Sequence, residues 1–235
     1  MTDVFDLDVN FDMRTDVGPG QDPDARSLKL RSYHQALWSK ELPSGRMFDL
    51  TPKPKTRNGL VHESGLRPLL LSSDTIGTAH RKRLSSLYSQ LSPEENEAFH
   101  RSAYTIAGFL VFPMGRSRSS INTVRGMNSL ISDRLDLTLE SIRRHYEGGQ
   151  SPLSAKLDEY GDFFDAFGSF AGYIDFFHLG DAVKPDGSVD FFYDFDDFRT
   201  QRLPRELDEY IEYRKRMLAF LDARRSRIQR AWDER

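Results

Sequence analysis

The chain has no cysteine among its 235 residues, and this absence removes several kinds of chemistry. Without thiols there is no disulfide, no thiolate nucleophile and no cysteine-ligated zinc, as is typical of a reducing compartment. The sequence also has no apolar run of the roughly 20 residues that a membrane-spanning helix needs. Its first twelve residues, MTDVFDLDVNFD, are acidic and do not resemble a signal peptide. We therefore expect a cytoplasmic protein with no membrane partner.

A large excess of charge is lacking too, because 33 basic residues stand against 36 acidic ones and leave a net charge of −3. Such a balance gives no general attraction to nucleic acid. The charge is nevertheless uneven: residues 158–197 hold eleven acids and one Lys, whereas residues 214–230 hold seven basic residues and one acid. These segments can pair with each other inside the fold or serve partners, and the sequence leaves both interpretations open.

The length and the 38% hydrophobic content suit one domain over residues 1–235. Helical periodicity dominates, and short alternating or apolar runs indicate a few strands. We predict an α+β fold, a helix-rich single domain with a central, mostly antiparallel sheet and a long C-terminal helix. The strands are expected at 5–11, in a hairpin over 40–50, at 109–112 and at 189–193, and the helices at 27–38, 75–91, 92–104, 133–147, 151–167 and 203–232.

The densest polar cluster lies in Ser119–Tyr146, where a loop rich in Arg and Ser is expected to run into a helix from Asp133 onward. Arginines placed before a helix N-terminus suit an anion, because the helix dipole and the free N–H groups point there. Bidentate guanidinium contacts would add to phosphate or carboxylate binding. The predicted ligand-binding residues are Arg14, Asn122, Arg125, Asn128 and Arg134, and the predicted catalytic residues are Asp133, Asp136 and His34.

A structural interpretation of the same cluster is equally open. Asp133, Arg134 and Asp136 can form an internal ion-pair network that fixes the helix to the sheet. His34 lies on the apolar face of the helix that Ser27 caps, where a histidine is more often part of the core than catalytic.

Two further motifs carry less weight. The serines before Asp74 lack the G-x-S-x-G turn of a hydrolase, although Asp74 and His62 remain outlying candidates. The acids of 194–197 lack the glycine and the terminal glutamate of a calcium loop, so no metal site is predicted.

These observations support three function hypotheses. The first is an intracellular domain that binds or acts on an anionic small molecule, most plausibly a nucleotide. The second is a non-enzymatic interaction module of a defence or stress-response system, which would use the acidic, aromatic-rich segment 158–197 or the C-terminal helix. The third is nucleic-acid binding through the basic residues of 78–83 and 214–230. The sequence leaves enzyme status, cofactors and oligomeric state unknown.

Several motifs, taken together, resemble an uncharacterised bacterial or phage protein family whose domain has no known function. The motifs are FDMRTDVGPGQDPD, YHQALWSKELPSGRMFDL, SSDTIG, INTVRG, DRLDLTLESIRRHY and SPL followed by FAGYIDFFHLGD. They cover the chain from Phe11 to about Tyr213. The resemblance implies one whole-chain domain and no known activity.

Overall fold

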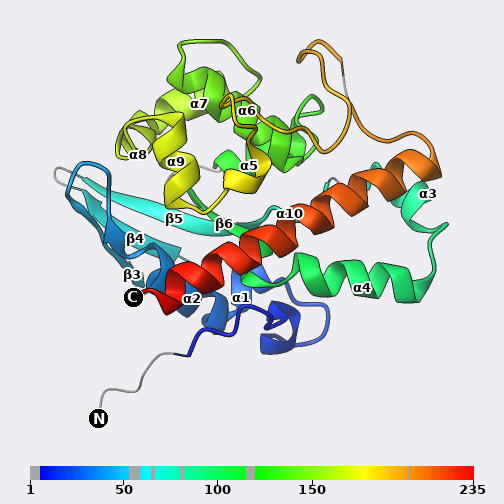
Figure 1. Cartoon of the computed structure of the whole chain (residues 1–235), viewed down its shortest axis with the longest axis horizontal. Helices are drawn as coiled ribbons and strands as arrows, with labels where there is room; N and C mark the ends of the chain where they lie inside the picture. Colours follow the sequence, from blue (N-terminus) through cyan, green and yellow to red (C-terminus); the bar gives the residue numbers. More distant parts are fainter. Residues whose placement is uncertain (1–5, 53–58, 65–66, 80–81, 115–119, 201) are drawn as a thin grey trace.

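The computed structural model describes residues 6–52, 59–64, 67–79, 82–114, 120–200 and 202–235. A four-stranded antiparallel sheet lies between groups of helices (Figure 1), and the predicted α+β class with its long C-terminal helix is confirmed. In chain order, with η for 3-10 helices, the elements are η1 (Met13–Asp16), α1 (Pro23–Arg26), α2 (Leu28–Trp38), β1 (Lys40–Glu41), β2 (Met47–Phe48), β3 (Leu50–Pro52), β4 (Gly59–Ser64), β5 (Arg67–Thr75), α3 (Ser85–Tyr88), α4 (Pro93–Ala103), η2 (Ile106–Gly108), β6 (Phe109–Pro113), α5 (Ile121–Met127), α6 (Leu135–Tyr146), α7 (Ser154–Glu159), α8 (Gly161–Asp165), α9 (Phe170–Phe176), η3 (Gly180–Ala182) and α10 (Leu207–Asp233).

The central sheet has the strand order β3-β4-β5-β6, and each neighbouring pair is antiparallel. In β5, Leu71 lies opposite Leu60 of β4 and Pro113 of β6. All five residues of β6 are buried although it ends the strand order, because α5 and other helices pack around it. The predicted strand at 109–112 is confirmed. The predicted 40–50 hairpin forms as the separate pair β1–β2 and does not join this sheet.

The N-terminal segment does not form the predicted strand over its described residues 6–11. The alternation does describe burial, because Leu7 and Val9 are buried and their neighbours are exposed. The backbone makes local turns instead, as where Asn10 N–H donates to the carboxylate of Asp8 at 2.9 Å. Asp side chains favour such turns over a strand ladder. Phe5 lies outside the described residues.

The strand predicted at 189–193 is also wrong, since this segment makes only an isolated bridge at Val189. Side chains from elsewhere bond its backbone. The Phe192 N–H donates to the carboxylate of Asp136 at 2.9 Å, and the Tyr193 carbonyl accepts from the guanidinium of Arg134 at 2.9 Å. Charged partners therefore replace a neighbouring strand.

Helix starts follow their capping signals where those signals are strong. The Ser27 side chain caps α2, and Ser92 caps α4 with Pro93 in the first turn and a reciprocal bond to Glu95. The sequence thus predicted these two boundaries correctly.

Two helix predictions and one loop prediction are wrong. Within 75–91, only 85–88 is α-helical among the residues that the structure describes. The expected loop before Asp133 contains the helix α5, and the expected single helix at 151–167 is divided into α7 and α8.

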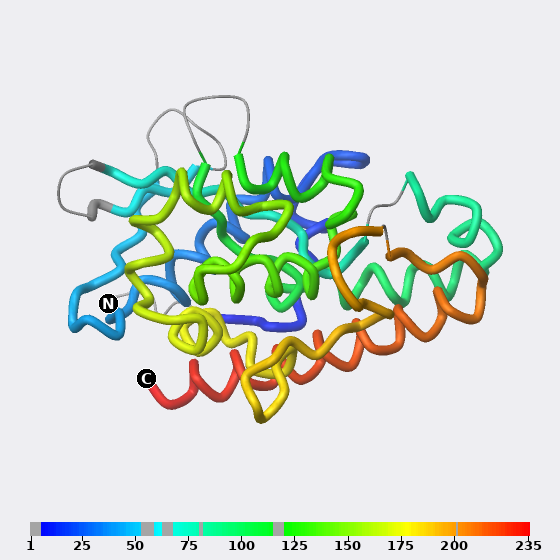
Figure 2. The backbone as a smooth tube through the Cα atoms, turned by 90° about the horizontal axis from the view of Figure 1, so that it is seen from above, coloured from blue at the N-terminus to red at the C-terminus, as the bar shows by residue number. Residues whose placement is uncertain are grey.

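The C-terminal helix α10 runs along one side of the molecule (Figures 1 and 2). It packs on the domain over its whole length, because Leu221 and Ile228 are fully buried near its far end. The helix also buries Arg224 completely, and this guanidinium donates to the carbonyls of Ala107 at 2.6 Å and Phe177 at 3.0 Å. Arginine in α10 therefore joins separate layers of the fold.

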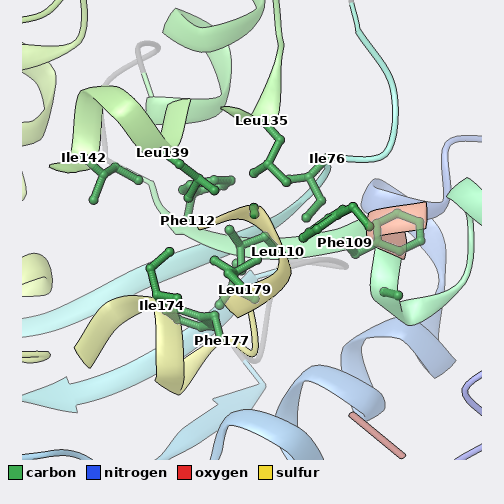
Figure 3. Close-up of a cluster of buried hydrophobic side chains, with 14 of the residues drawn as sticks. Ile76, Phe109, Leu110, Phe112, Leu135, Leu139, Ile142, Ile174, Phe177 and Leu179 are labelled. Carbon is green, nitrogen blue, oxygen red and sulfur yellow. The ribbon is translucent and has the colours of Figure 1, made fainter. Parts of the chain in front are cut away.

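One connected core runs through these layers. Figure 3 shows side chains of α6 facing those of β6, with residues from α9 and the turn after it on the other side. The aromatic residues of 160–177 supply much of this core. One domain over residues 1–235 stays a prediction, and the single core supports it. The labelled members of the cluster are Ile76, Phe109, Leu110, Phe112, Leu135, Leu139, Ile142, Ile174, Phe177 and Leu179.

Gly108→Ala is expected to destabilise the protein by about 1–3 kcal/mol, the usual range for overpacking. A Cβ atom at Gly108 would lie 1.8 Å from the carbonyl oxygen of Ala103, so the backbone would have to move. The matched control is Gly161→Ala, where a Cβ atom meets nothing within 4 Å. Urea denaturation measures both changes, and equal stability of the two variants would contradict the packing at η2.

Candidate functional site

Arg134 and Asp136 form an ion pair in which both side chains are completely buried. The Arg134 Nε–H donates to Asp136 Oδ1 at 3.0 Å, and the same guanidinium donates to the carbonyls of Tyr193 and Arg202 at 2.9 and 2.7 Å. The pair thus fixes the segment before α10 to the start of α6. This geometry favours the structural interpretation of the two residues, and their predicted ligand and catalytic roles stay predictions.

Arg125 of α5 is also completely buried, but it lies behind an open cavity. Its guanidinium contacts the carboxylate of Asp74 at the end of β5 and lies 3.5 Å from that of Asp133. Its Nε–H donates to the Thr138 hydroxyl at 2.9 Å. Arg125 therefore ties β5, α5 and α6 together and balances two carboxylates.

The cavity that Asp74 and Asp133 line has a volume of about 920 Å³. It lies between the N-terminal loop, the end of β5 and the connection from α5 to α6. Six of its lining residues are acidic and two are basic, so its surface favours ligands with hydrogen-bond donors or positive charge over anions. The charged lining residues are Asp12, Asp22, Asp24, Asp74, Glu97, Asp133, Arg14 and Lys82.

Asp24 reaches the cavity from the short helix α1, which Asp22 caps and which Pro23 begins. Its Oδ2 accepts from the Thr75 N–H at 3.0 Å and from the Thr75 hydroxyl at 2.7 Å. Its Oδ1 is buried and has no hydrogen-bond partner in the described part of the chain. A buried carboxylate oxygen without a donor is costly, so this atom suits a donor from a ligand.

The carboxyls of Asp74 and Asp24 have perturbed pKa values. Burial raises the pKa of Asp74 to about 8, although the guanidinium of Arg125 lowers it. Burial raises the pKa of Asp24 to about 6, against hydrogen bonds from Thr75 and Ser73 that lower it. Both carboxyls therefore hold a proton more readily than an exposed aspartate does.

The backbone is strained where the chain carries Asp133, the other acid beside Arg125. Ser132 and Asp133 both have positive φ angles, of 50° and 59°, a region that residues other than glycine seldom occupy. The Asp133 N–H donates to the carbonyl of Arg125 at 3.2 Å, which helps to hold this conformation. Consecutive strained residues are characteristic of functional sites, and these two aim the Asp133 side chain at the cavity.

The structure brings some predicted site residues to the cavity and places others elsewhere. Arg14 lines it but already pairs with Asp12 and Glu97, at 2.6 and 2.7 Å. Asn122 lies beside β5, where its amide donates to the Ser72 hydroxyl at 3.0 Å.

The other two predicted residues are held in local structure. Asn128 ends α5, and its side chain accepts from the Leu130 N–H at 2.9 Å within the following turn. His34 is buried on α2, where its Nε2 lies 2.9 Å from the hydroxyl of the buried Ser73, and it does not line the cavity.

Sequence reasoning missed Asp24 and gave Asp74 only an outlying role. Asp24 lies in VGPGQDPDA, which its glycine and proline content correctly marks as irregular. The available signal was Asp22-Pro23, a helix start that places Asp24 in a first turn. Nothing in the sequence shows that this turn lies against the end of β5.

The basic run at 214–230 is largely engaged within the fold. Arg214 is buried and donates to the side chain of Asn96 at 2.8 Å, and Arg224 is buried as described above. Arg227 pairs with Asp181 at 2.8 Å. Nucleic-acid binding by this run stays a prediction, and these contacts reduce the cation surface that it would use.

No helix in the described ranges is both long and apolar enough to cross a membrane. Within the same residues, no group of three or more His, Asp or Glu side chains is arranged to hold a metal ion.

Comparison with known proteins identifies the family but no activity. Residues 7–228 match the model of a family of unknown function, DUF6994, and the chain belongs to this family. The predicted resemblance to a family without known function is thereby confirmed. No curated protein and no solved structure matches the chain.

Proposed function

We propose that the acidic cavity is a small-molecule site whose carboxyls bind a neutral or cationic polar ligand and exchange a proton with it. The observation that carries the proposal is the pair Asp24 and Asp74, two partly buried carboxyls that line the cavity and whose pKa values burial raises. Perturbed titratable groups in a cavity are characteristic of acid–base sites.

The charge of the lining supports a ligand with amine or hydroxyl donors. Of the two basic lining residues, Arg14 is already bound to two acids, and Lys82 is exposed at the edge. The fully buried Arg125 and Arg134 present no guanidinium surface to a phosphate. The anionic ligand expected from the sequence, a nucleotide, therefore has less support than a nucleoside, amine or amino sugar.

Two matched pairs of probes test the ligand charge: glucosamine with glucose 6-phosphate, and adenosine with AMP. Each is titrated into the whole protein while backbone amide NMR signals are followed. We expect glucosamine or adenosine to shift the signals of Thr75 and Gly126, which line the cavity. The phosphorylated partners should bind about tenfold more weakly or worse, because juxtaposed like charges cost several kcal/mol.

Two outcomes would count against the proposal. Tighter binding of the two phosphorylated probes would contradict the proposed neutral or positive charge of the ligand and would favour the nucleotide hypothesis. Shifts confined to signals remote from the cavity would contradict the site itself.

The proposal also retains the cytoplasmic location, from the cysteine-free composition, and the bacterial or phage origin, from the family resemblance.

A further inference from the structure

A separate cavity of about 510 Å³ lies between the segment 191–195 and the first turns of α10, and we call it the aromatic cavity. The helix contributes Glu209, Glu212, Tyr213 and Arg216. Their spacing of three, one and three residues places them on one face of α10. The cavity has the size of a small-molecule site, and it shares no lining residue with the acidic cavity.

Every residue that lines the aromatic cavity is either aromatic or charged. Five carry an aromatic ring, three carry a carboxylate and one is an arginine. Phe191, Tyr193 and Phe195 are only half-buried, and the ring centroids of Phe191 and Phe195 lie 4.5 Å apart. Aromatic side chains that gather at a cavity without being buried in the core are typical of a binding surface.

The charges among these rings favour a cation. Asp194, Glu209 and Glu212 stand against Arg216 alone in the lining, which leaves a surplus of two negative charges. The guanidinium of Arg216 already donates to the carbonyl of Phe191 at 3.1 Å and to the carboxylate of Glu212 at 3.4 Å. The lining therefore attracts a positive group and has no unengaged cation for an anion.

Two of the carboxylates remain open to a ligand. Asp194 and Glu212 are exposed. From outside the lining, Arg202 lies 3.5 Å from Asp194 and Lys215 lies 3.6 Å from Glu212. Ion pairs of this kind between groups in contact with water are weak, so a cation in the cavity can compete with them.

The aromatic segment is fixed before any ligand arrives. The buried Asp136 accepts from the Phe192 N–H at 2.9 Å, and its partner Arg134 donates to the Tyr193 carbonyl at 2.9 Å. The Phe192 ring packs on Phe220 of α10 with its centroid 5.4 Å away. A site that is held in place in this way loses little conformational entropy on binding.

We propose that the aromatic cavity binds a small organic cation with a methylated ammonium group. The rings of Phe191, Tyr193 and Phe195 contact the methyl groups, and Asp194 and Glu212 balance the charge. Aromatic faces attract cations through their quadrupole, and quaternary ammonium ligands are recognised in this way. A quaternary ammonium donates no N–H hydrogen bond, so it suits a lining in which rings outnumber carboxylates. This site does not depend on the function proposed for the acidic cavity.

The first test compares choline with 3,3-dimethylbutan-1-ol, an uncharged molecule of the same shape. Each is titrated into the whole wild-type protein while backbone amide NMR signals are followed. Choline should shift the signals of Phe195 and Glu212. The uncharged analogue should bind about fivefold more weakly, the factor that corresponds to one exposed cation–π contact. Equal binding of the two probes, or no shift of either signal with choline, would overturn the proposal.

The second test removes one charge from the lining. Glu212→Gln should weaken choline binding about two- to fivefold, the range for an exposed ion pair. The matched control is Asp208→Asn, an exposed acid of the same helix that does not line the cavity, and it should bind choline as the wild type does. Equal affinity of all three proteins would contradict recognition of the cation by this lining.

Three further outcomes would overturn the proposal by identifying another occupant or another site. A short peptide with trimethyllysine that shifts the Phe195 and Glu212 signals where choline does not would assign the cavity to a protein partner. Shifts of these signals with protein concentration alone would assign it to a second copy of the chain. A choline shift confined to Thr75 would place the cation in the acidic cavity instead.

Discussion

Asp136→Asn is expected to destabilise the protein by about 3–5 kcal/mol, the cost of leaving a buried charge without its partner. Arg134 and Asp136 have no solvent exposure, so water cannot replace the lost carboxylate. The Phe192 N–H would also lose its acceptor. Urea denaturation at pH 7 measures the change directly.

The matched control is Asp196→Asn, which removes an exposed partner of Arg202 in the same region and should change stability little. The double variant Arg134→Met/Asp136→Leu should lose less than Asp136→Asn, because it removes both buried charges together. A cost of less than about 1 kcal/mol for Asp136→Asn would contradict the structural role of this pair.

Asp74→Asn is expected to change how stability depends on pH. Burial raises the pKa of Asp74 to about 8 in the folded protein, against 3.8 for the ordinary side chain. Between those values the folded state holds a proton that the unfolded state has released. The stability of the wild type relative to the variant should therefore fall as pH rises from about 4 to 8, by about 1.4 kcal/mol for each unit of pKa difference.

Urea unfolding of both proteins at pH 5, 7 and 9 measures this difference. The asparagine imitates the protonated carboxyl, so the two proteins should be closest in stability near pH 5. Asp186→Asn is the control, because hydrogen bonds from Ser188 lower the pKa of Asp186 and it stays ionised over this range. A wild-type stability relative to the variant that stays constant from pH 5 to pH 9 would show that Asp74 is ionised throughout and would contradict its raised pKa.

Much of the fold could be predicted because its signals are local. The caps at Ser27 and Ser92 and the apolar run of β6 each lie within a few residues of what they determine. The failures occur where remote side chains bond a backbone. The predicted strand at 189–193 is held by Arg134 and Asp136.

In the candidate site, too, local features could be predicted from the sequence and remote contacts could not. The sequence indicated Arg125 and Asp133 as members of a dense polar cluster; Asp133 lines the cavity, and Arg125 lies buried behind it. It could not show their partners, because 51 residues separate Arg125 from Asp74 and another 51 separate Asp24 from Thr75. The sequence suggested the guanidinium groups of Arg125 and Arg134 for an anionic ligand. In the folded protein both groups are buried and already paired with carboxylates.

The most direct test of the account is glucosamine binding to the wild type and to Gly126→Leu. Gly126 lines the cavity on α5, and a Cβ atom there meets nothing within 4 Å, so a larger side chain projects into open space and removes no charge. Leucine is also a better helix former than glycine, so the variant should stay folded. The account predicts that glucosamine shifts the Thr75 signal in the wild type and not in Gly126→Leu. Equal binding to both proteins would contradict the central claim that this cavity is the functional site.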